Sequence, residues 1–122
     1  MNQGEEKRIL DIANPITDGI LRGFNENDYA EYSRNFSEIM LRSLGKAKFE
    51  ETRDFIISKT GKYLSRGDPQ VVDQGPYAIV VYRAKFREEP EVFVKVVFSK
   101  NDPENKVTGL WFDSQKLRGS IQ

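Results

Sequence analysis

The fold is decided by residues 47–66, AKFEETRDFIISKTGKYLSR, because the spacing of the apolar residues changes at Gly61. Before Gly61, apolar residues recur every three or four positions, which is typical of helices with one buried face. After Gly61 they recur at every second position, in runs that Gly and Pro interrupt, which is typical of strands. Helices followed by strands favour an α+β domain.

We expect three helices before Gly61. The first is predicted over residues 5–24, where an apolar stripe runs from Ile9 to Phe24. Pro15 lies inside this stripe and does not interrupt it. We therefore expect one helix that is kinked at Pro15 rather than two separate helices.

The second helix should begin at Asp28, which forms a capping box with Glu31. Its apolar face continues past a break at Ser37, and Gly45 is a suitable C-terminal cap. The third helix is predicted over residues 47–59.

Four strands are expected after Gly61, with the first one in two parts. They are Lys62–Ser65 resumed at Gln70–Asp73, Tyr77–Arg87, Glu91–Lys100 and Lys106–Asp113. The prediction is a single α+β domain over residues 1–122: three N-terminal helices (about 5–60) packed on a curved four-stranded antiparallel sheet (about 61–113), then a polar tail over 114–122.

The predicted strands are apolar on both faces. In the Tyr77 strand, Ala78, Val80 and Tyr82 alternate with Ile79 and Val81. In the last strand, strict alternation places Val107 and Trp111 on one face and Leu110 and Phe112 on the other. Helices should cover one face, and we expect a homodimer to form through the other, outer face. The alternative is that long Lys and Arg stems cover the outer face.

The composition excludes several kinds of chemistry. The chain has no His and no Cys, which excludes Ser-His-Asp triads, thiolate nucleophiles and zinc–sulfur sites. We expect no metal and no cofactor. Lys and Arg number 19, as do Asp and Glu, so we expect no nucleic-acid partner. No run of 18 apolar residues is present, and the chain begins with polar residues, so we expect no membrane partner and a cytoplasmic location.

Three segments carry a resemblance to a known superfamily: Asn27-Asp28-Tyr29 with Phe36-Ser37, Gly61-Lys62-Tyr63, and Val107-Thr108-Gly109-Leu110-Trp111-Phe112. The chain resembles the nuclear transport factor 2-like superfamily, the cone-shaped α+β fold of ketosteroid isomerases and polyketide cyclases. More narrowly, it resembles a prokaryotic family of unknown function within that superfamily. The resemblance implies a long first helix across a curved sheet, a pocket between helices and sheet, and dimerisation through the sheet.

Four aromatic residues are the candidate ligand-binding residues of this pocket: Tyr32, Phe36, Tyr63 and Trp111. The alternative is that they only fill the core, which is the commoner role of aromatic residues at helical or strand spacing.

Two further kinds of site remain open. The isomerase-like members imply a carboxylate paired with an acidic donor, for which this chain offers Asp28 or Asp113 with Tyr32 or Tyr63. The alternative is that these carboxylates only cap a helix and end a strand. A basic cluster of Arg83, Lys85 and Lys95 could hold an anion, or could form cross-strand pairs with Glu88 or Glu91.

The function predicted is a non-catalytic binding or interaction module that accepts a small apolar or weakly anionic molecule. No residue is assigned as catalytic. The alternatives are a His-free isomerase or lyase with an Asp–Tyr pair, and a purely structural dimerisation unit.

Overall fold

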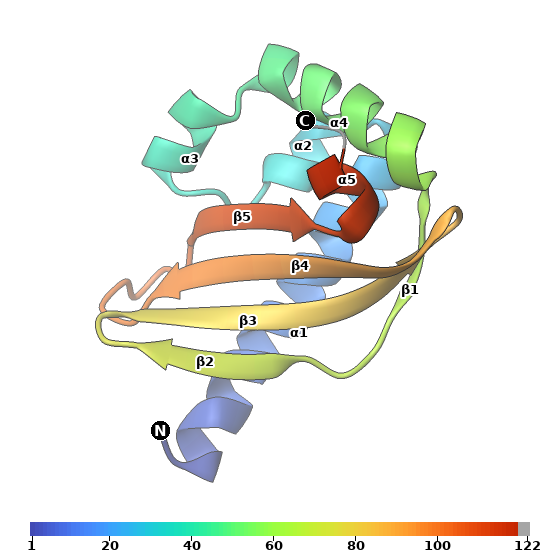
Figure 1. Cartoon of the computed structure of the whole chain (residues 1–122). Helices are drawn as coiled ribbons and strands as arrows, with labels where there is room; N and C mark the ends of the chain where they lie inside the picture. Colours follow the sequence, from blue (N-terminus) through green and yellow to red (C-terminus); the bar gives the residue numbers. More distant parts are fainter. Residues whose placement is uncertain (120–122) are drawn as a thin grey trace.

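The computed structural model describes residues 1–119, in which a layer of helices covers one face of a curved antiparallel sheet (Figure 1). Helix α1 (Gln3–Glu26) crosses behind the sheet. The Asn2 side chain accepts a hydrogen bond from the Glu5 amide and caps its start. The helix continues through Pro15 and ends at Asn27, whose φ is 56°. The prediction of one helix through Pro15 is confirmed.

The second predicted helix is two short ones, α2 (Tyr29–Ser33) and α3 (Glu38–Ser43). Asp28 caps α2 as expected, and Ser37 caps α3. The chain leaves the helical conformation between them because Phe36 enters the core and pairs with the last strand.

Helix α4 (Lys46–Thr60) follows α3 after two residues, Leu44 and Gly45. Gly45 is the N-cap of α4, and Leu44 is the C-cap of α3, so the assignment of Gly45 as a C-cap is wrong. Gly61 ends α4 with a φ of 72°, a backbone conformation that glycine adopts without strain.

The sheet has five strands where four were predicted. They are β1 (Tyr63–Arg66), β2 (Gln70–Gln74), β3 (Tyr77–Phe86), β4 (Glu89–Ser99) and β5 (Val107–Asp113). Both β1 and β2 pair with β3, at opposite ends of it, while β4 and then β5 continue the sheet on the other side. The two parts of the predicted first strand are thus separate strands along one edge, because Gly67-Asp68-Pro69 interrupts their pairing.

A β-bulge changes which face Val107 occupies. Val97 pairs with Gly109 and Phe98 pairs with Val107, so Thr108 is an extra residue in β5. Val107 therefore shares the helix-covered face with Phe98, whereas Trp111 lies on the outer face. The prediction that Val107 and Trp111 share a face is wrong, because strict alternation does not survive a bulge.

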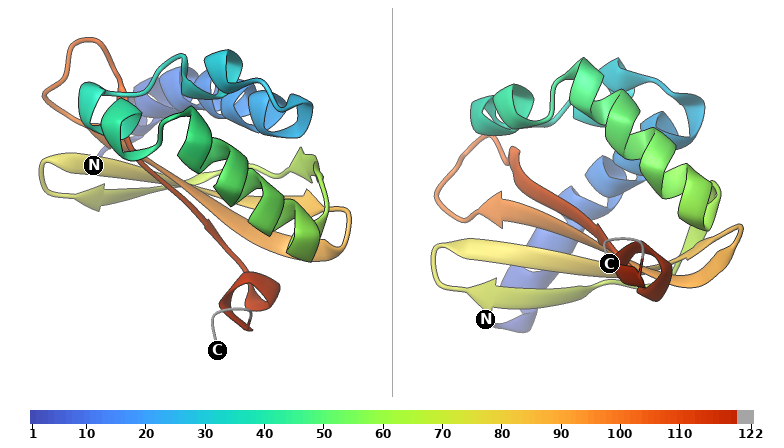
Figure 2. Two further views of the ribbon diagram at one scale, coloured as in Figure 1. Left: turned by 90° about the horizontal axis from the view of Figure 1, so that it is seen from above. Right: turned by 45° about the horizontal axis from the view of Figure 1, so that its top comes forward.

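The core lies between α1 and the covered face of the sheet. Its most deeply buried strand residues come from β3, β4 and the start of β5: Val80, Tyr82, Val92, Val94, Val96 and Val107. The two views in Figure 2 place all four N-terminal helices on this side.

The end of α1 is tied to distant parts of the chain. The Arg53 guanidinium donates to the carbonyl oxygens of Phe24 (2.6 Å) and Asn25 (3.1 Å). The Asn25 side chain in turn exchanges two hydrogen bonds with the backbone of Tyr63. The two Arg53 bonds reach carbonyls in the last turn of α1, where a helix has no further amides of its own to offer.

The predicted polar tail contains a short helix, α5 (Gln115–Gly119), with Leu117 buried. Residues 120–122 of that predicted tail lie outside the described residues. Within residues 1–119, every helix is too short or too polar to cross a membrane.

Candidate ligand groove

The predicted pocket residues separate into two groups. Tyr32 and Phe36 are buried together, with ring centroids 5.2 Å apart, and Phe49 lies 4.4 Å from Tyr32. Tyr63 lies near the opposite edge of the sheet, where its ring contacts Phe86. The structure therefore brings Tyr32 and Phe36 into contact and places Tyr63 elsewhere.

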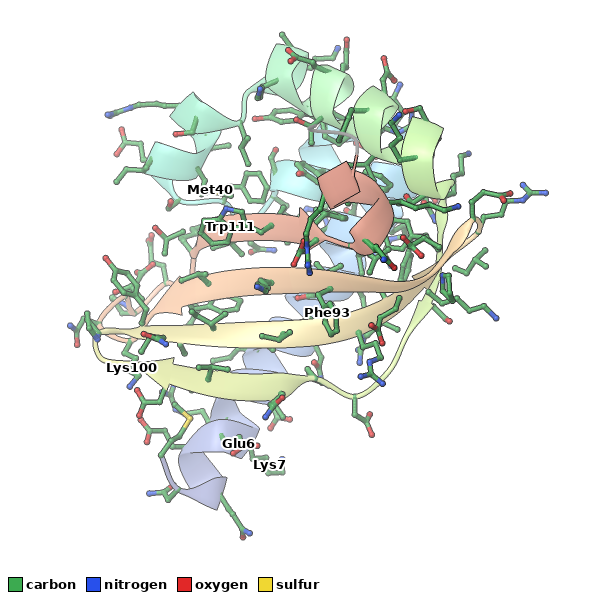
Figure 3. All side chains as sticks on the ribbon, viewed as in Figure 1. Glu6, Lys7, Met40, Phe93, Lys100 and Trp111 are labelled. Carbon is green, nitrogen blue, oxygen red and sulfur yellow. The ribbon has the colours of Figure 1, made fainter. Side chains whose placement is uncertain are left out.

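Trp111 has a different environment from the other three residues. It lies on the outer face of β5 and is 58% exposed. Figure 3 labels it above Phe93, which is on the outer face of β4. Its ring lies over Gly109, because a Cβ added to Gly109 would come within 2.7 Å of the indole. A glycine at this position leaves the space that the indole occupies.

An apolar groove of about 280 Å³ opens between α4 and β5. Two of the four predicted residues, Tyr32 and Trp111, line it. The remaining lining residues are Leu44, Thr52, Phe55, Ile56, Leu110, Phe112, Asp113, Leu117 and Arg118.

Local sequence patterns position the groove walls. Thr52, Phe55 and Ile56 have the three- and four-residue spacing that places side chains on one helical face. Leu110 and Phe112 alternate along β5 on its helix-covered face. None of these residues was predicted to bind a ligand, although the spacing of Thr52, Phe55 and Ile56 indicates a shared helix face.

An ion pair closes one end of the groove. The Arg118 guanidinium donates two hydrogen bonds to Asp113, at 2.8 and 3.0 Å. The hydrogen bond from Arg118 lowers the pKa of Asp113 below its usual value, and Asp113 raises the pKa of Arg118. Asp113 is therefore held as a carboxylate, which is the opposite of what a general acid or a base with a raised pKa needs.

The other predicted carboxylate is a helix cap. Asp28 is exposed and accepts a hydrogen bond from the Glu31 amide at 3.1 Å. Burial raises the pKa of Tyr32 well above its usual value, so this phenol stays protonated. Among the described residues, neither the Asp28 nor the Asp113 carboxylate makes a hydrogen bond with the hydroxyl group of Tyr32 or Tyr63. Asp28 and Tyr32 are joined through the backbone instead, where the Tyr32 amide donates to the Asp28 carbonyl at 3.0 Å.

A polar cluster joins α1 to the sheet, and no sequence spacing predicts it because its members are far apart in the chain. Arg66 donates to both oxygens of Asp18 and lies 5.2 Å from the centre of the Tyr82 ring. The Tyr82 hydroxyl donates to Asn14 at 2.8 Å. Burial raises the pKa of Tyr82 to about 12. The cluster fixes α1 against β3.

The predicted basic cluster is divided between two hollows. Arg83 and Lys85 line a polar hollow of about 520 Å³ beside the interruption between β1 and β2. Arg83 pairs with Glu91 at 3.1 Å, as the cross-strand alternative predicted. Lys95 lines a separate hollow on the outer face, beside Ile79 and Trp111. Residues 1–119 contain no group of three metal-ligating side chains.

Comparison with known families identifies the chain at the family level. Residues 18–110 match the family described as "Protein of unknown function (DUF3887)". The chain belongs to this family. The match runs from the middle of α1 into β5, so it includes α4 and half of the groove. No curated protein and no solved structure matches the chain.

Proposed function

We propose that this DUF3887 domain is a non-catalytic binding module and that its ligand site is the groove between α4 and β5. The observation that carries the proposal is the groove itself, whose walls are mainly aliphatic and aromatic side chains. Small-molecule sites typically enclose about 300–1,000 Å³ and are lined mainly by such side chains. A volume of about 280 Å³ suits a small apolar group.

The arrangement of the carboxylates supports a non-catalytic role over the Asp–Tyr enzyme. Asp28 caps α2 and Asp113 is paired with Arg118. A catalytic carboxylate would need to reach a substrate proton, and both of these carboxylates already have a structural partner.

We also propose that the domain adopts the nuclear transport factor 2-like fold and forms a homodimer through its outer sheet face. The long α1 across a curved antiparallel sheet supports the fold. The outer face supports the dimer, because Tyr77 and Trp111 are 45% and 58% exposed there and Ile79 lies between them. Exposed apolar patches of this kind often mark interfaces.

The ligand proposal is tested by titrating the ¹⁵N-labelled domain with indole and with 4-phenylbutyrate. We expect chemical-shift changes at Leu110 and Phe112. Phe55→Glu, which places a charge in the groove wall, should abolish them. Ile39→Glu is the matched control, because Ile39 is exposed on α3 and does not line the groove. Shift changes that persist in Phe55→Glu, or that occur only on the outer face, would contradict the proposal.

A further inference from the structure

Strand β5 is an edge of the sheet, and most of that edge has no backbone partner in the part of the chain that the structure describes. One side of β5 pairs with β4 along its whole length. On the other side, among residues 1–119, backbone hydrogen bonds are made only by Val107. Alternate residues beyond Val107 therefore direct N–H and C=O groups away from the sheet. Such an edge is a template for another extended chain.

The protein itself already pairs an extended segment with the start of this edge. The Val107 amide donates to the Asn35 carbonyl at 2.7 Å, and the Ser37 amide donates to the Val107 carbonyl at 2.8 Å. Phe36 and Val107 thus form a parallel bridge. Ser37 then caps α3 and the chain leaves the edge. The pairing begins here and stops after one residue.

The apolar groove runs beside the unpaired part of the same edge. Leu110 and Phe112 form its floor, and Phe55 and Leu117 come from α4 and α5. In an extended chain, side chains alternate between two directions. A strand added to β5 would therefore direct every second side chain toward the groove. The Asp113–Arg118 pair at the end of the groove leaves no net charge there.

We propose that the groove binds an extended peptide with apolar side chains at alternate positions, which adds to the free edge of β5 as a further strand. This inference rests on the proposed function, since it names the class of molecule that carries the apolar group. Backbone hydrogen bonds to β5 supply affinity for any extended chain, and the groove selects the side chains.

The position of α4 favours a peptide over a second copy of the domain. Two copies joined through β5 by antiparallel pairing would be related by a two-fold axis perpendicular to the sheet. Both helix layers would then lie on the same face. Because α4 lies alongside and beyond the β5 edge (Figure 1), it would meet its own symmetry copy. A single peptide strand carries no such layer.

The inference is tested with a displayed library of short linear peptides, selected on the full domain. The selection is repeated on Phe55→Glu and on Leu64→Glu, a matched control at an exposed residue of the opposite edge. We expect enriched peptides that bind the wild type and the Leu64→Glu variant and lose binding to Phe55→Glu. Synthetic versions are then N-methylated at alternate amides, in two complementary sets.

Strand addition predicts different results for the two methylated sets. One set should lose at least about tenfold in affinity, because its amides donate to β5, and the other set should bind as the parent peptide does. Bound peptide should also slow amide exchange in β5. Three outcomes would overturn the inference: no enrichment that depends on Phe55, equal affinity of both methylated sets, or protection of β5 by self-association of the free domain. If indole still binds the groove in any of these cases, only the peptide inference fails and the proposed function stands.

Discussion

Along β3, Ala78, Val80 and Tyr82 are buried beneath the helices, whereas Ile79 and Val81, which alternate with them, are only half-buried. The two faces of this strand contain the same kinds of apolar residue. The difference lies in what covers them, since α1 lies over one face and no described element lies over the other. Along β3, apolar alternation thus predicts which residues share a face, while the exposure of each face depends on what packs against it.

The largest expected difference in stability is between substitutions on the two faces of β3. Phe86→Ala removes a fully buried ring on the covered face, and we expect it to lower the free energy of unfolding by about 3–5 kcal/mol. Tyr77→Ala on the outer face should cost less than about 1 kcal/mol in the monomer. Urea unfolding at low protein concentration measures both. Equal losses would show that the two faces are packed alike.

Alkaline pH should destabilise the folded domain, because Tyr82 on the covered face keeps its proton to a higher pH in the folded chain than in the unfolded chain. The folded-state pKa of about 12 lies above the usual value of 10.0, so between these pH values the unfolded chain releases a proton that the folded chain keeps. Stability should therefore be intact below about pH 10 and decrease by up to about 2–3 kcal/mol as the pH rises toward 12.

The control for this prediction is Tyr82→Phe, which removes the hydroxyl and should flatten the Tyr82 part of the pH dependence. Thermal unfolding followed by circular dichroism between pH 8 and 12 provides the measurement. An unchanged slope in Tyr82→Phe would contradict the assignment to this side chain.

A smaller effect is expected from Gly109→Ala on the outer face. The added Cβ would come within 2.7 Å of the Trp111 ring and 3.2 Å of the Val97 Cβ. We expect the Trp111 ring to move and the free energy of unfolding to fall by about 1–2 kcal/mol. Because Trp111 is the single tryptophan, its emission should shift to longer wavelength.

A double-mutant cycle tests whether the indole is the cause. If the new methyl group clashes with the indole ring, Gly109→Ala should lower the free energy of unfolding much less when Trp111 is also replaced by Ala. The same cost in both backgrounds would assign the strain to the β5 backbone instead.

The smallest effect on monomer stability is expected from Ile79→Ser, at below about 1 kcal/mol. Its effect on association should be large, because Ile79 lies at the centre of the proposed outer-face interface. Sedimentation equilibrium should find a wild-type dimer and an Ile79→Ser monomer of 14.1 kDa. A wild-type monomer at high concentration would rule out the dimer.

The sequence predicted those parts of the fold that depend on local patterns. The stripe across Pro15, the cap at Asp28 and the change of period at Gly61 all act between residues close in the chain, and each matches the structure. The bulge at Thr108 and the separation of β1 from β2 depend on pairing with another strand. Strict alternation contains no information about such pairing.

The candidate site was less predictable for the same reason. Tyr32 and Trp111 line the groove, but its other walls come from α4, β5 and α5, which meet only in three dimensions. The Asp18–Arg66 pair spans 48 positions of the chain. A single sequence offers no spacing rule that connects such residues, whereas an i, i+3, i+4 face such as that of Phe55 can be recognised in advance.

The way α1 ends has a consequence for how the domain folds. Near the end of α1, the Phe24 and Asn25 carbonyls accept hydrogen bonds from Arg53, and the Asn25 side chain is held by the backbone of Tyr63. Neither partner is in place until α4 and β1 have docked. We therefore expect the last turn of α1 to gain its full set of hydrogen bonds only when α4 and β1 have formed, which would couple the ordering of the helical and sheet halves of the domain.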